Sequence, residues 1–435
     1  MKYSIVIPTY NRCDDLLKPC VESVLKYTDM TDVELIISAN GCTDNTQDYL
    51  NWLSAQFNML GFSKHLKVVW NNEPLGYPKA TNEGIKCATA DKIILLNNDA
   101  ILTEQAKNTW INMLDKPFND EYRCGISCII KEHCEFADKD FAIFFCVMIH
   151  RKVFDAIGLL NEEYGVGSGE DTEFSIEATY AGFKVLECLP KTYSNEKYLY
   201  TGNFPIYHRG EATVHDPSLV KDWNFVFHMN SLKLAKKYNL EKYRFLLTNN
   251  YERSVILKGD PKLPHLALER ARYTWAGQRV LGTKVLEIGC TTGYGVEYLP
   301  MNIDYTGVDY DRTIIEVAKE QNWGTQYKFV YADINLYNLE FYDTIIAFEI
   351  IEHLDNGKEL VQRLKQHCRR LIFSVPYQEP PGYYGIHHRL HNLSEHDFPG
   401  FKYMFLRPDG TIQNTPGPVE LGKSHLNLML CEYDS

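Results

Sequence analysis

The chain has 435 residues, of which 45% are hydrophobic and 23% are charged, an ordinary composition for a globular protein. At roughly 100 to 200 residues per domain, this length predicts two or three domains. The 45 basic and 57 acidic residues give a formal net charge of -12, which opposes binding to the phosphate backbone of a nucleic acid.

The sequence contains no apolar run that matches a membrane span. The longest candidate is 141–149, whereas roughly 18 to 20 residues are needed to cross a bilayer. The amino terminus, MKYSIVIPTYNR, starts a strand pattern at once and has no signal-peptide features. The twelve cysteines follow no CxxC spacing, which argues against structural zinc. We therefore expect a soluble, cytoplasmic protein without a transmembrane segment.

Short β-branched runs alternate with helical patterns in the first half of the chain, which is typical of a mostly parallel α/β sheet. The predicted strands are 3–7, 33–37, 66–70 and 92–96, and the predicted helices include 20–27 and 82–88. A glycine-rich segment at 165–169 precedes the acidic pair Glu170 and Asp171, which opens a further helix that runs through Tyr180.

A helical pattern at 222–251 follows, and the sequence GDPKLP at 259–264 interrupts it. The α/β rhythm then begins again, with predicted strands at 285–288, 305–308, 329–331, 344–348 and 371–375 and helices starting at Gly295 and Thr313. Residues 1–250 carry 26 basic and 33 acidic residues, and the rest carry 19 and 24, so the net charges are -7 and -5. Neither half is a basic domain.

The first half has polar residues where its predicted strands end. These segments are PTYNR at 8–12, SANGCTD at 38–44 and NND at 97–99. Open parallel sheets bind ligands at the carboxyl ends of their strands, so these segments predict a ligand site.

Five segments in order resemble the motifs of the family 2 inverting glycosyltransferases, which have the GT-A fold: SIVIPTYNR, ELIISANGCTDNT, EPLGYPKATNEGI, LLNNDA and GEDTEFSIEATYAGF. The resemblance covers about residues 1–240 and implies a nucleotide-sugar donor and a glycan acceptor. The residues that it implies for binding the nucleotide sugar are Pro8, Thr9, Tyr10, Arg12, Asn40, Lys79, Asn98, Asp99 and Glu170. It also implies that Asp99 holds Mn or Mg, and that His208 closes this metal site, with His215 as the alternative.

The resemblance also suggests how the reaction proceeds. A sugar hydroxyl needs a general base to take its proton, and we assign this role to Asp171. A divalent cation at Asp99 stabilises the charge on the leaving nucleoside diphosphate. The chain has Ala39 where the family usually has an aspartate that reads the nucleotide base, so the identity of the base stays open.

The second half contains a strand, a glycine turn and a helix start in VLEIGCTTGYG at 285–295. Asp309 ends the next predicted strand, 20 residues after Gly289, which suits a carboxylate that binds ribose hydroxyls. The glycine spacing also fits short-chain dehydrogenases that bind NAD. No tyrosine after 285 has a lysine four positions on, however, and this weakens the redox interpretation.

Together, RYTWAGQRVLGTKVLEIGCTTGYG, YTGVDYD, FVYADI and YDTIIAFEIIEHL resemble the class I S-adenosylmethionine-dependent methyltransferases, over about 265–435. The resemblance implies a Rossmann-like fold in which LNLMLCEY at 426–433 is an antiparallel edge strand. The residues that it implies for binding S-adenosylmethionine are Glu287, Gly289, Gly293, Asp309 and Asp333. Thr291 stands where the family has the middle glycine of the turn.

The motif Glu349-x-x-Glu352-His353 admits three interpretations. If the segment is helical, the three side chains lie on one face, and a few methyltransferases that act on vicinal hydroxyls use such a motif to hold Mg. His388 would then be a further ligand. Alternatively, His353 is a catalytic base without a metal, or it has a structural role.

The leading hypothesis is a bifunctional enzyme that transfers a sugar to a glycan and O-methylates a sugar hydroxyl. We expect a glycosyltransferase domain at 1–240, a helical bridge at 241–264 and a methyltransferase domain at 265–435. One rival hypothesis makes the second half a noncatalytic module. Two others are an RNA-modifying enzyme, which the acidic halves oppose, and a glycan-binding protein without activity.

Overall fold

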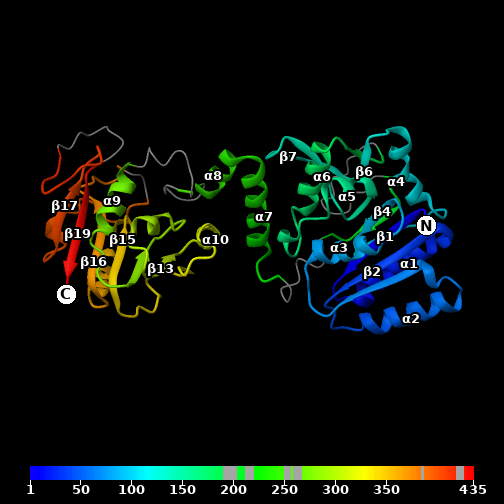
Figure 1. The fold of residues 1–435 in the computed structure, drawn as a ribbon, viewed down its shortest axis with the longest axis horizontal. Coiled ribbons are helices and arrows are strands. Elements are labelled where there is room, and N and C mark those ends of the chain that lie inside the picture. Colours follow the sequence, from blue (N-terminus) through cyan, green and yellow to red (C-terminus); the bar gives the residue numbers. More distant parts are fainter. Residues whose placement is uncertain (190–202, 211–219, 249–255, 258–266, 384–386, 418–425) are drawn as a thin grey trace. The chain divides into compact units, whose positions relative to one another are not determined.

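The computed structural model describes residues 1–189, 203–210, 220–248, 256–257, 267–383, 387–417 and 426–435. The chain divides into two compact units, Met1–Tyr243 and Arg244–Ser435, each built around its own sheet (Figure 1). None of the described helices is both long enough and apolar enough to cross a membrane.

The amino-terminal unit contains a seven-stranded sheet in the order β10-β6-β9-β4-β1-β2-β3. The strands of this unit are β1 (Tyr3–Thr9), β2 (Val33–Asn40), β3 (Leu66–Asn71), β4 (Lys92–Leu96), β5 (Ala100–Leu102), β6 (Cys124–Cys128), β7 (Lys131–Cys134), β8 (Lys139–Ala142), β9 (Cys146–His150), β10 (Lys184–Glu187) and β11 (Ile206–His208). Strands β4, β1, β2 and β3 are parallel, and β9 is antiparallel to both of its neighbours. Two short pairs, β5 with β11 and β7 with β8, lie outside this sheet.

Helices cover both faces of this sheet (Figure 1). The helices of this unit are α1 (Lys18–Tyr27), α2 (Thr46–Met59), α3 (Tyr77–Cys87), α4 (Thr109–Asp120), α5 (Arg151–Ile157), α6 (Glu170–Tyr180) and α7 (Trp223–Tyr238), with shorter helical turns at η1 (Cys13–Leu17), η2 (Met30–Asp32), η3 (Ser63–His65) and η4 (Glu162–Tyr164). Helix α8 (Leu240–Thr248) contains the boundary between the two units. Ile5 and Ile7 pack against α1, α2 and α4, whereas Val6 faces α3, α5 and α6. This alternation buries β1 on both sides, as expected for a strand that crosses a central sheet.

The carboxy-terminal unit contains an eight-stranded sheet in the order β14-β13-β12-β15-β16-β19-β17-β18. Its strands are β12 (Lys284–Ile288), β13 (Asp304–Asp309), β14 (Lys328–Tyr331), β15 (Tyr342–Phe348), β16 (Cys368–Pro376), β17 (Lys402–Leu406), β18 (Ile412–Gln413) and β19 (Leu428–Asp434), and its helices are α9 (Ala267–Gly277), α10 (Arg312–Gln321) and α11 (Gly357–Lys365), with short turns at η6 (Tyr294–Tyr298), η7 (Ile351–His353) and η8 (Glu395–Asp397). The first five strands are parallel and follow the Rossmann order. Helices α9 and α10 pack on one face of the sheet and α11 packs on the other.

The nine strands predicted from β-branched runs are all present, and the bridge pattern at 222–251 is helical where it is described. Two details were wrong. The helix expected from Gly295 is the short 3-10 turn η6, because Tyr294 to Tyr298 is followed at once by Leu299 and Pro300 in extended backbone. The terminal strand β19 is antiparallel, as expected, but it lies between β16 and β17 rather than at the edge. The predicted domain limits remain a prediction, because 249–255 and 258–264 of the expected bridge lie outside the described residues.

One buried tryptophan ties α4 to the end of α1 in the amino-terminal unit. The Trp110 side chain is fully buried, and its indole N–H donates to Thr28 Oγ1 at 3.1 Å.

We predict that Trp110→Ala lowers the unfolding free energy of this unit by about 3 to 5 kcal/mol, because the truncation leaves a cavity. Hydrogen exchange at amides of β1 and β2, measured by mass spectrometry on the full chain, tests this. Trp52→Ala is the control, because Trp52 is 53% exposed and its removal is expected to leave exchange unchanged. Equal exchange in the two variants would contradict the prediction.

Candidate functional site

In the amino-terminal unit, the loops after β1 and β2 are tied to each other. Asn11 and Arg12 both have left-handed backbone, with φ of 47° and 56°. This turn directs Asn11 Oδ1 to the backbone N–H of Thr43, at 2.7 Å. Cys13 N–H in turn donates to Asp44 Oδ2 at 2.9 Å. The predicted nucleotide residues that follow β1 therefore sit on a loop whose shape depends on β2.

The predicted residues Pro8, Thr9, Tyr10 and Arg12 occupy the end of β1 and this loop. Thr9 is buried, and its hydroxyl accepts a hydrogen bond from Asn98 Nδ2 at 2.9 Å. The Arg12 guanidinium forms an ion pair with Asp15, which also contacts Arg209 at 3.3 Å. Two cationic side chains thus gather near the end of β1, where they are suited to an anionic ligand.

Asp99 and His208 lie together, although 109 positions separate them in the sequence. The pairing of β5 with β11 sets His208 opposite Ala100, beside the end of β4. The distance from His208 Nε2 to Asp99 Oδ1 is 3.2 Å, and the imidazole stacks on the Phe145 ring with centroids 4.2 Å apart. Among the described residues, neither of these two buried atoms makes a hydrogen bond. Carboxylate oxygens and imidazole nitrogens are common ligands of divalent cations. These two atoms, which lack a hydrogen bond among the described residues, therefore fit a divalent-cation site.

Two further predicted nucleotide-sugar residues lie around the loop between β3 and α3. Asn40 is buried, and its amide oxygen accepts from Leu75 N–H while its amide nitrogen donates to Gly76 O at 3.5 Å. The Asn40 side chain therefore organises the loop. Lys79 is exposed on the first turn of α3.

The acidic pair begins α6. Gly169, with φ of 105°, precedes the first turn, and Glu170 is 5% exposed. Burial and the neighbouring Asp171 raise the pKa of the Glu170 carboxyl to about 8, so this group is protonated at neutral pH. Burial also raises the pKa of Asp171, whose Oδ1 accepts from Thr172 N–H at 2.7 Å. A protonated Glu170 leaves Asp171 as the charged member of the pair, which suits a proton acceptor.

In the carboxy-terminal unit, the turn after β12 is held by the end of β13. Gly289 and Gly293 have left-handed backbone, with φ of 72° and 71°. A Cβ on Gly289 would come within 2.2 Å of the Ile350 side chain, so glycine is required there. Thr291 also has left-handed backbone, with φ of 47°, and its N–H donates to Asp309 Oδ2 at 3.1 Å. The turn therefore keeps its shape although a β-branched residue replaces a glycine.

The other residues predicted to bind S-adenosylmethionine differ in exposure. Asp309 is 5% exposed at the end of β13, and its Oδ1 accepts from Asp311 N–H at 3.0 Å. Asp333 is exposed in the turn after β14, where its Oδ1 accepts from Asn335 N–H at 2.8 Å. Glu287 is 1% exposed inside β12, and its two oxygens accept from the hydroxyls of Tyr273 and Tyr305. Glu287 thus points into a buried tyrosine pair.

Three of the four predicted metal ligands of this unit come together. One ligand atom each from Glu352, His353 and His388 lies within 4.8 Å of the others. Both Glu352 carboxylate oxygens are buried, and within the described residues they accept no hydrogen bond. Burial lowers the pKa of His353 to about 4, so its imidazole is neutral, as metal binding requires. The set fits a divalent cation.

The fourth residue, Glu349, is not part of this group, and the helical geometry assumed for the motif was wrong. Glu349 has left-handed backbone with φ of 51°, and only Ile351 to His353 form a 3-10 turn. The Glu349 carboxylate instead accepts from Ser374 Oγ at 2.6 Å and lies 3.5 Å from the Arg272 guanidinium.

Sequence reasoning missed two residues that touch these groups. Glu379 is 1% exposed, and its carboxylate lies 2.6 Å from His388 Nδ1, where it orients the imidazole. The position of Glu379, three residues after β16, could have identified it from the sequence, because site residues follow the strands of a parallel sheet. Arg272 is 5% exposed on α9 and pairs with Glu269 as well as Glu349. Arg272 is the first residue of the segment RYTWAGQRVLGTKVLEIGCTTGYG, which resembles a methyltransferase motif, but no spacing in the sequence marks it as a site residue.

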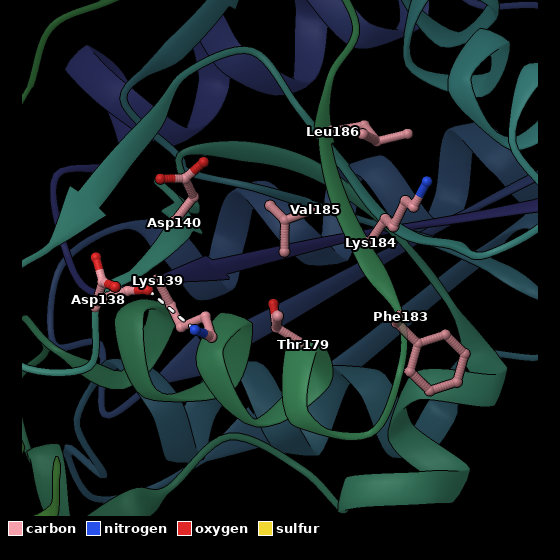
Figure 2. A pocket seen from close by; sticks show the side chains of 8 residues that line it. All are labelled: Asp138, Lys139, Asp140, Thr179, Phe183, Lys184, Val185 and Leu186. Carbon is pink, nitrogen blue, oxygen red and sulfur yellow. Dashed lines mark hydrogen bonds between the residues drawn. The ribbon is translucent and has the colours of Figure 1, made fainter.

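A pocket of about 340 Å³ opens elsewhere in the amino-terminal unit (Figure 2). Its lining residues are Asp138, Lys139, Asp140, Thr179, Phe183, Lys184, Val185 and Leu186. It contains none of the predicted site residues, and it lies between β8, the end of α6 and β10 rather than at the carboxyl ends of β1, β2 and β4.

Comparison with known families agrees with the division of the chain into two units. Residues 4–158 match the family model described as glycosyl transferase family 2. The amino-terminal unit therefore contains a family 2 glycosyltransferase domain. Residues 286–370 match a family model described as a methyltransferase domain. The carboxy-terminal unit contains a methyltransferase domain, so the two families of domain occur in one chain.

Individual relatives share only part of the chain. A poly(ribitol-phosphate) beta-glucosyltransferase of Bacillus spizizenii is 31% identical over 114 residues, which is 26% of this chain. The match spans only 17% of that relative's length. A solved mannosyltransferase of Pyrobaculum calidifontis, in complex with GDP-Man and Mn2+, is 14% identical, with 57% of this chain and 70% of that chain covered and a TM-score of 0.39. The magnesium protoporphyrin IX methyltransferase of Synechocystis PCC 6803 with bound SAH is 16% identical, with 45% and 95% covered and a TM-score of 0.31.

The buried Glu287 carboxyl is expected to make the stability of the carboxy-terminal unit depend on pH. Burial raises the pKa of its carboxyl from 4.5 to about 7, although Tyr273 and Tyr305 donate to it. Between these two pH values the folded state binds more protons than the unfolded state, so the unfolding free energy falls as pH rises. We predict a fall of about 3 kcal/mol over this window that is absent in Glu287→Gln.

Calorimetric melting of the full chain from pH 4.5 to pH 8 measures this effect as the difference between the two proteins. Glu359→Gln is the control, because Glu359 is exposed on α11. A difference between wild type and Glu287→Gln that does not change with pH would refute the prediction.

Proposed function

We propose that the chain is a bifunctional enzyme. The glycosyltransferase domain transfers a sugar, with inversion and with a divalent cation, from a nucleotide-sugar donor to a glycan acceptor. The methyltransferase domain transfers a methyl group from S-adenosylmethionine to a sugar hydroxyl. The observation that carries the first activity is the pair of Asp99 and His208, whose facing atoms are buried and lie 3.2 Å apart, in a domain whose α6 has Asp171 in its first turn. The similarity to a beta-glucosyltransferase supports a hexose as the transferred sugar.

In this mechanism Asp171 takes the proton of the acceptor hydroxyl as that oxygen bonds to the anomeric carbon. The bond from this carbon to the diphosphate oxygen breaks, and its electron pair leaves with the nucleoside diphosphate. Asp99 and His208 would hold Mn or Mg, which would stabilise the negative charge that develops on the leaving group. Arg12, near Arg209, adds positive charge beside the end of β1.

We predict that Asp171→Asn lowers the rate of sugar transfer by about 10² to 10⁴, because an amide does not accept the proton. The measurement is the release of nucleoside diphosphate from a panel of nucleotide sugars in buffer with Mn. Asp155→Asn is the matched control, since Asp155 is an exposed carboxylate on α5 of the same domain. If wild type released no diphosphate from any donor, an inactive glycan-binding protein would be favoured. Full activity of Asp171→Asn would remove Asp171 from the mechanism.

For the second activity, Asp309 would bind the ribose hydroxyls of S-adenosylmethionine beside the turn that contains Gly289 and Gly293. Glu352, His353 and His388 would hold a divalent cation, which would lower the pKa of an acceptor hydroxyl beside it. Glu379 keeps the His388 imidazole in its orientation, at 2.6 Å. Two observations support the metal over a histidine base: His353 is neutral, and within the described residues the two Glu352 oxygens accept no hydrogen bond. A base of low pKa accepts a proton poorly at neutral pH.

We predict that Glu352→Gln lowers methyl transfer by at least tenfold and weakens its dependence on added Mg, while affinity for S-adenosylmethionine stays unchanged. Methyl transfer to the glycosylated product is measured with labelled S-adenosylmethionine, and binding is measured by titration calorimetry on the full chain. Glu359→Gln serves again as the exposed control. Methyl transfer that proceeds equally with and without a chelator would favour the histidine base. Absence of S-adenosylmethionine binding in wild type would favour the noncatalytic module, and salt-sensitive binding of RNA would favour the RNA-modifying enzyme.

A further inference from the structure

Helix α7 contacts the glycine-rich loop that leads into α6. The Asn230 side chain is 3% exposed, and its amide nitrogen donates to two carbonyls, Gly167 O at 2.9 Å and Tyr164 O at 3.2 Å. On the same face of α7, Leu234 lies against Gly169, where an added Cβ would come within 3.5 Å of its side chain. Helix α7 lies beyond residues 4–158, the part of the chain that matches the glycosyltransferase family model.

This loop has little regular backbone structure of its own. Gly165, Gly167, Ser168 and Gly169 all have positive φ, at 61°, 119°, 77° and 105°. Ser168 is a non-glycine residue in this region, and such a conformation persists only where the surroundings impose it. The shape of the loop therefore depends on the groups that contact it from outside.

On its other side the loop meets the segment between β3 and α3. The backbone of Gly76 is so close that an added Cβ would come within 2.1 Å of Gly165 O. Asn40, at the end of β2, holds this segment through Leu75 and Gly76. The loop is thus held between the predicted nucleotide-sugar residue Asn40, acting through Gly76, and Asn230 on α7.

We propose that Asn230 is a positioning residue for sugar transfer, which holds the loop at 164–169 so that Asp171 meets the acceptor hydroxyl. This inference rests on the proposed glycosyltransferase activity and on the role of Asp171 in it. Asp171 follows Gly169 by two residues, so a shift of the loop moves the carboxylate directly. A displacement of about 1 Å in a reacting group costs on the order of 10² in rate.

Other contacts of α7 hold α6 further along and supply a control. Lys237 Nζ lies 3.0 Å from Glu173 Oε1 and 2.7 Å from Glu177 Oε1. These ion pairs join the two helices at Glu173, in the first turn of α6, and at Glu177. Glu173 also accepts a hydrogen bond from the Tyr164 hydroxyl at 2.7 Å, a contact that does not involve Lys237. Loss of Lys237 therefore weakens the packing of α7 on α6 and leaves the hydrogen bonds to Tyr164 and Gly167 in place.

The test compares Asn230→Leu, which keeps the side-chain volume and removes the donors, with Lys237→Gln in the full chain. We expect kcat for nucleoside diphosphate release to fall about 10- to 100-fold in Asn230→Leu, with the donor KM within about twofold of wild type. Lys237→Gln should keep the kcat of wild type. Asn230→Ser, which is small and retains one donor, should fall between Asn230→Leu and wild type, and it provides the measurement if Asn230→Leu does not fold.

A second readout separates this inference from the proposed function. Hydrogen exchange of the amides at 165–171 should increase at least tenfold in Asn230→Leu and stay unchanged in Lys237→Gln. If wild type releases no diphosphate, the proposed function fails, and the exchange data still decide whether Asn230 holds the loop. A folded Asn230 variant with wild-type kcat, or with unchanged exchange at 165–171, overturns the inference.

Discussion

A buried carboxylate costs free energy unless hydrogen bonds or positive charge compensate it, and both units contain several buried carboxylates. Most of these are compensated by the fold. Asp309 accepts from two backbone N–H groups, and Glu287 accepts from two tyrosines. Asp99, Glu170 and Glu352 differ, because within the described residues each has a buried oxygen that accepts no hydrogen bond. Of these three, Asp99 and Glu352 also lie beside a histidine, which separates the candidate metal ligands from Glu170 and from the compensated carboxylates.

Non-glycine residues with left-handed backbone lie near the candidate sites of both units. Asn11, Arg12, Ser168, Thr291 and Glu349 all have positive φ without being glycine, and each is a predicted site residue or lies within two positions of one. In three of these places the reason is visible, since the turn directs a backbone or side-chain group toward a neighbouring loop or strand. Asn11 reaches Thr43, Thr291 N–H reaches Asp309, and Glu349 reaches Ser374. Such conformations persist because the contacts around them offset their cost.

Prediction from the sequence succeeded where a local pattern decides the outcome. Runs of β-branched residues predicted nine strands of the two sheets, and these strands are present. Polar residues at the ends of two of these strands supplied the candidates Asp99 and Asp309, whose roles stay predictions. It failed where a local pattern was not sufficient. A spacing of i, i+3 and i+4 puts Glu349, Glu352 and His353 on one face only in a helix, and the left-handed Glu349 begins no helix. The buried Glu379 completes that cluster from another strand end, and no spacing in the sequence connects it to His388.

The sequence by itself determined that the chain has two α/β domains, and its motifs indicated which transfer reaction belongs to each. Strand propensity and strand-end polarity are local properties, so they can be read along one chain. Only the tertiary structure decided which distant residues meet. His208 reaches Asp99 because β11 pairs with β5, and Asn230 reaches the glycine-rich loop because α7 packs on it. Both contacts join residues more than 60 positions apart, and the packing of whole elements produces them rather than any pattern of neighbours in the sequence.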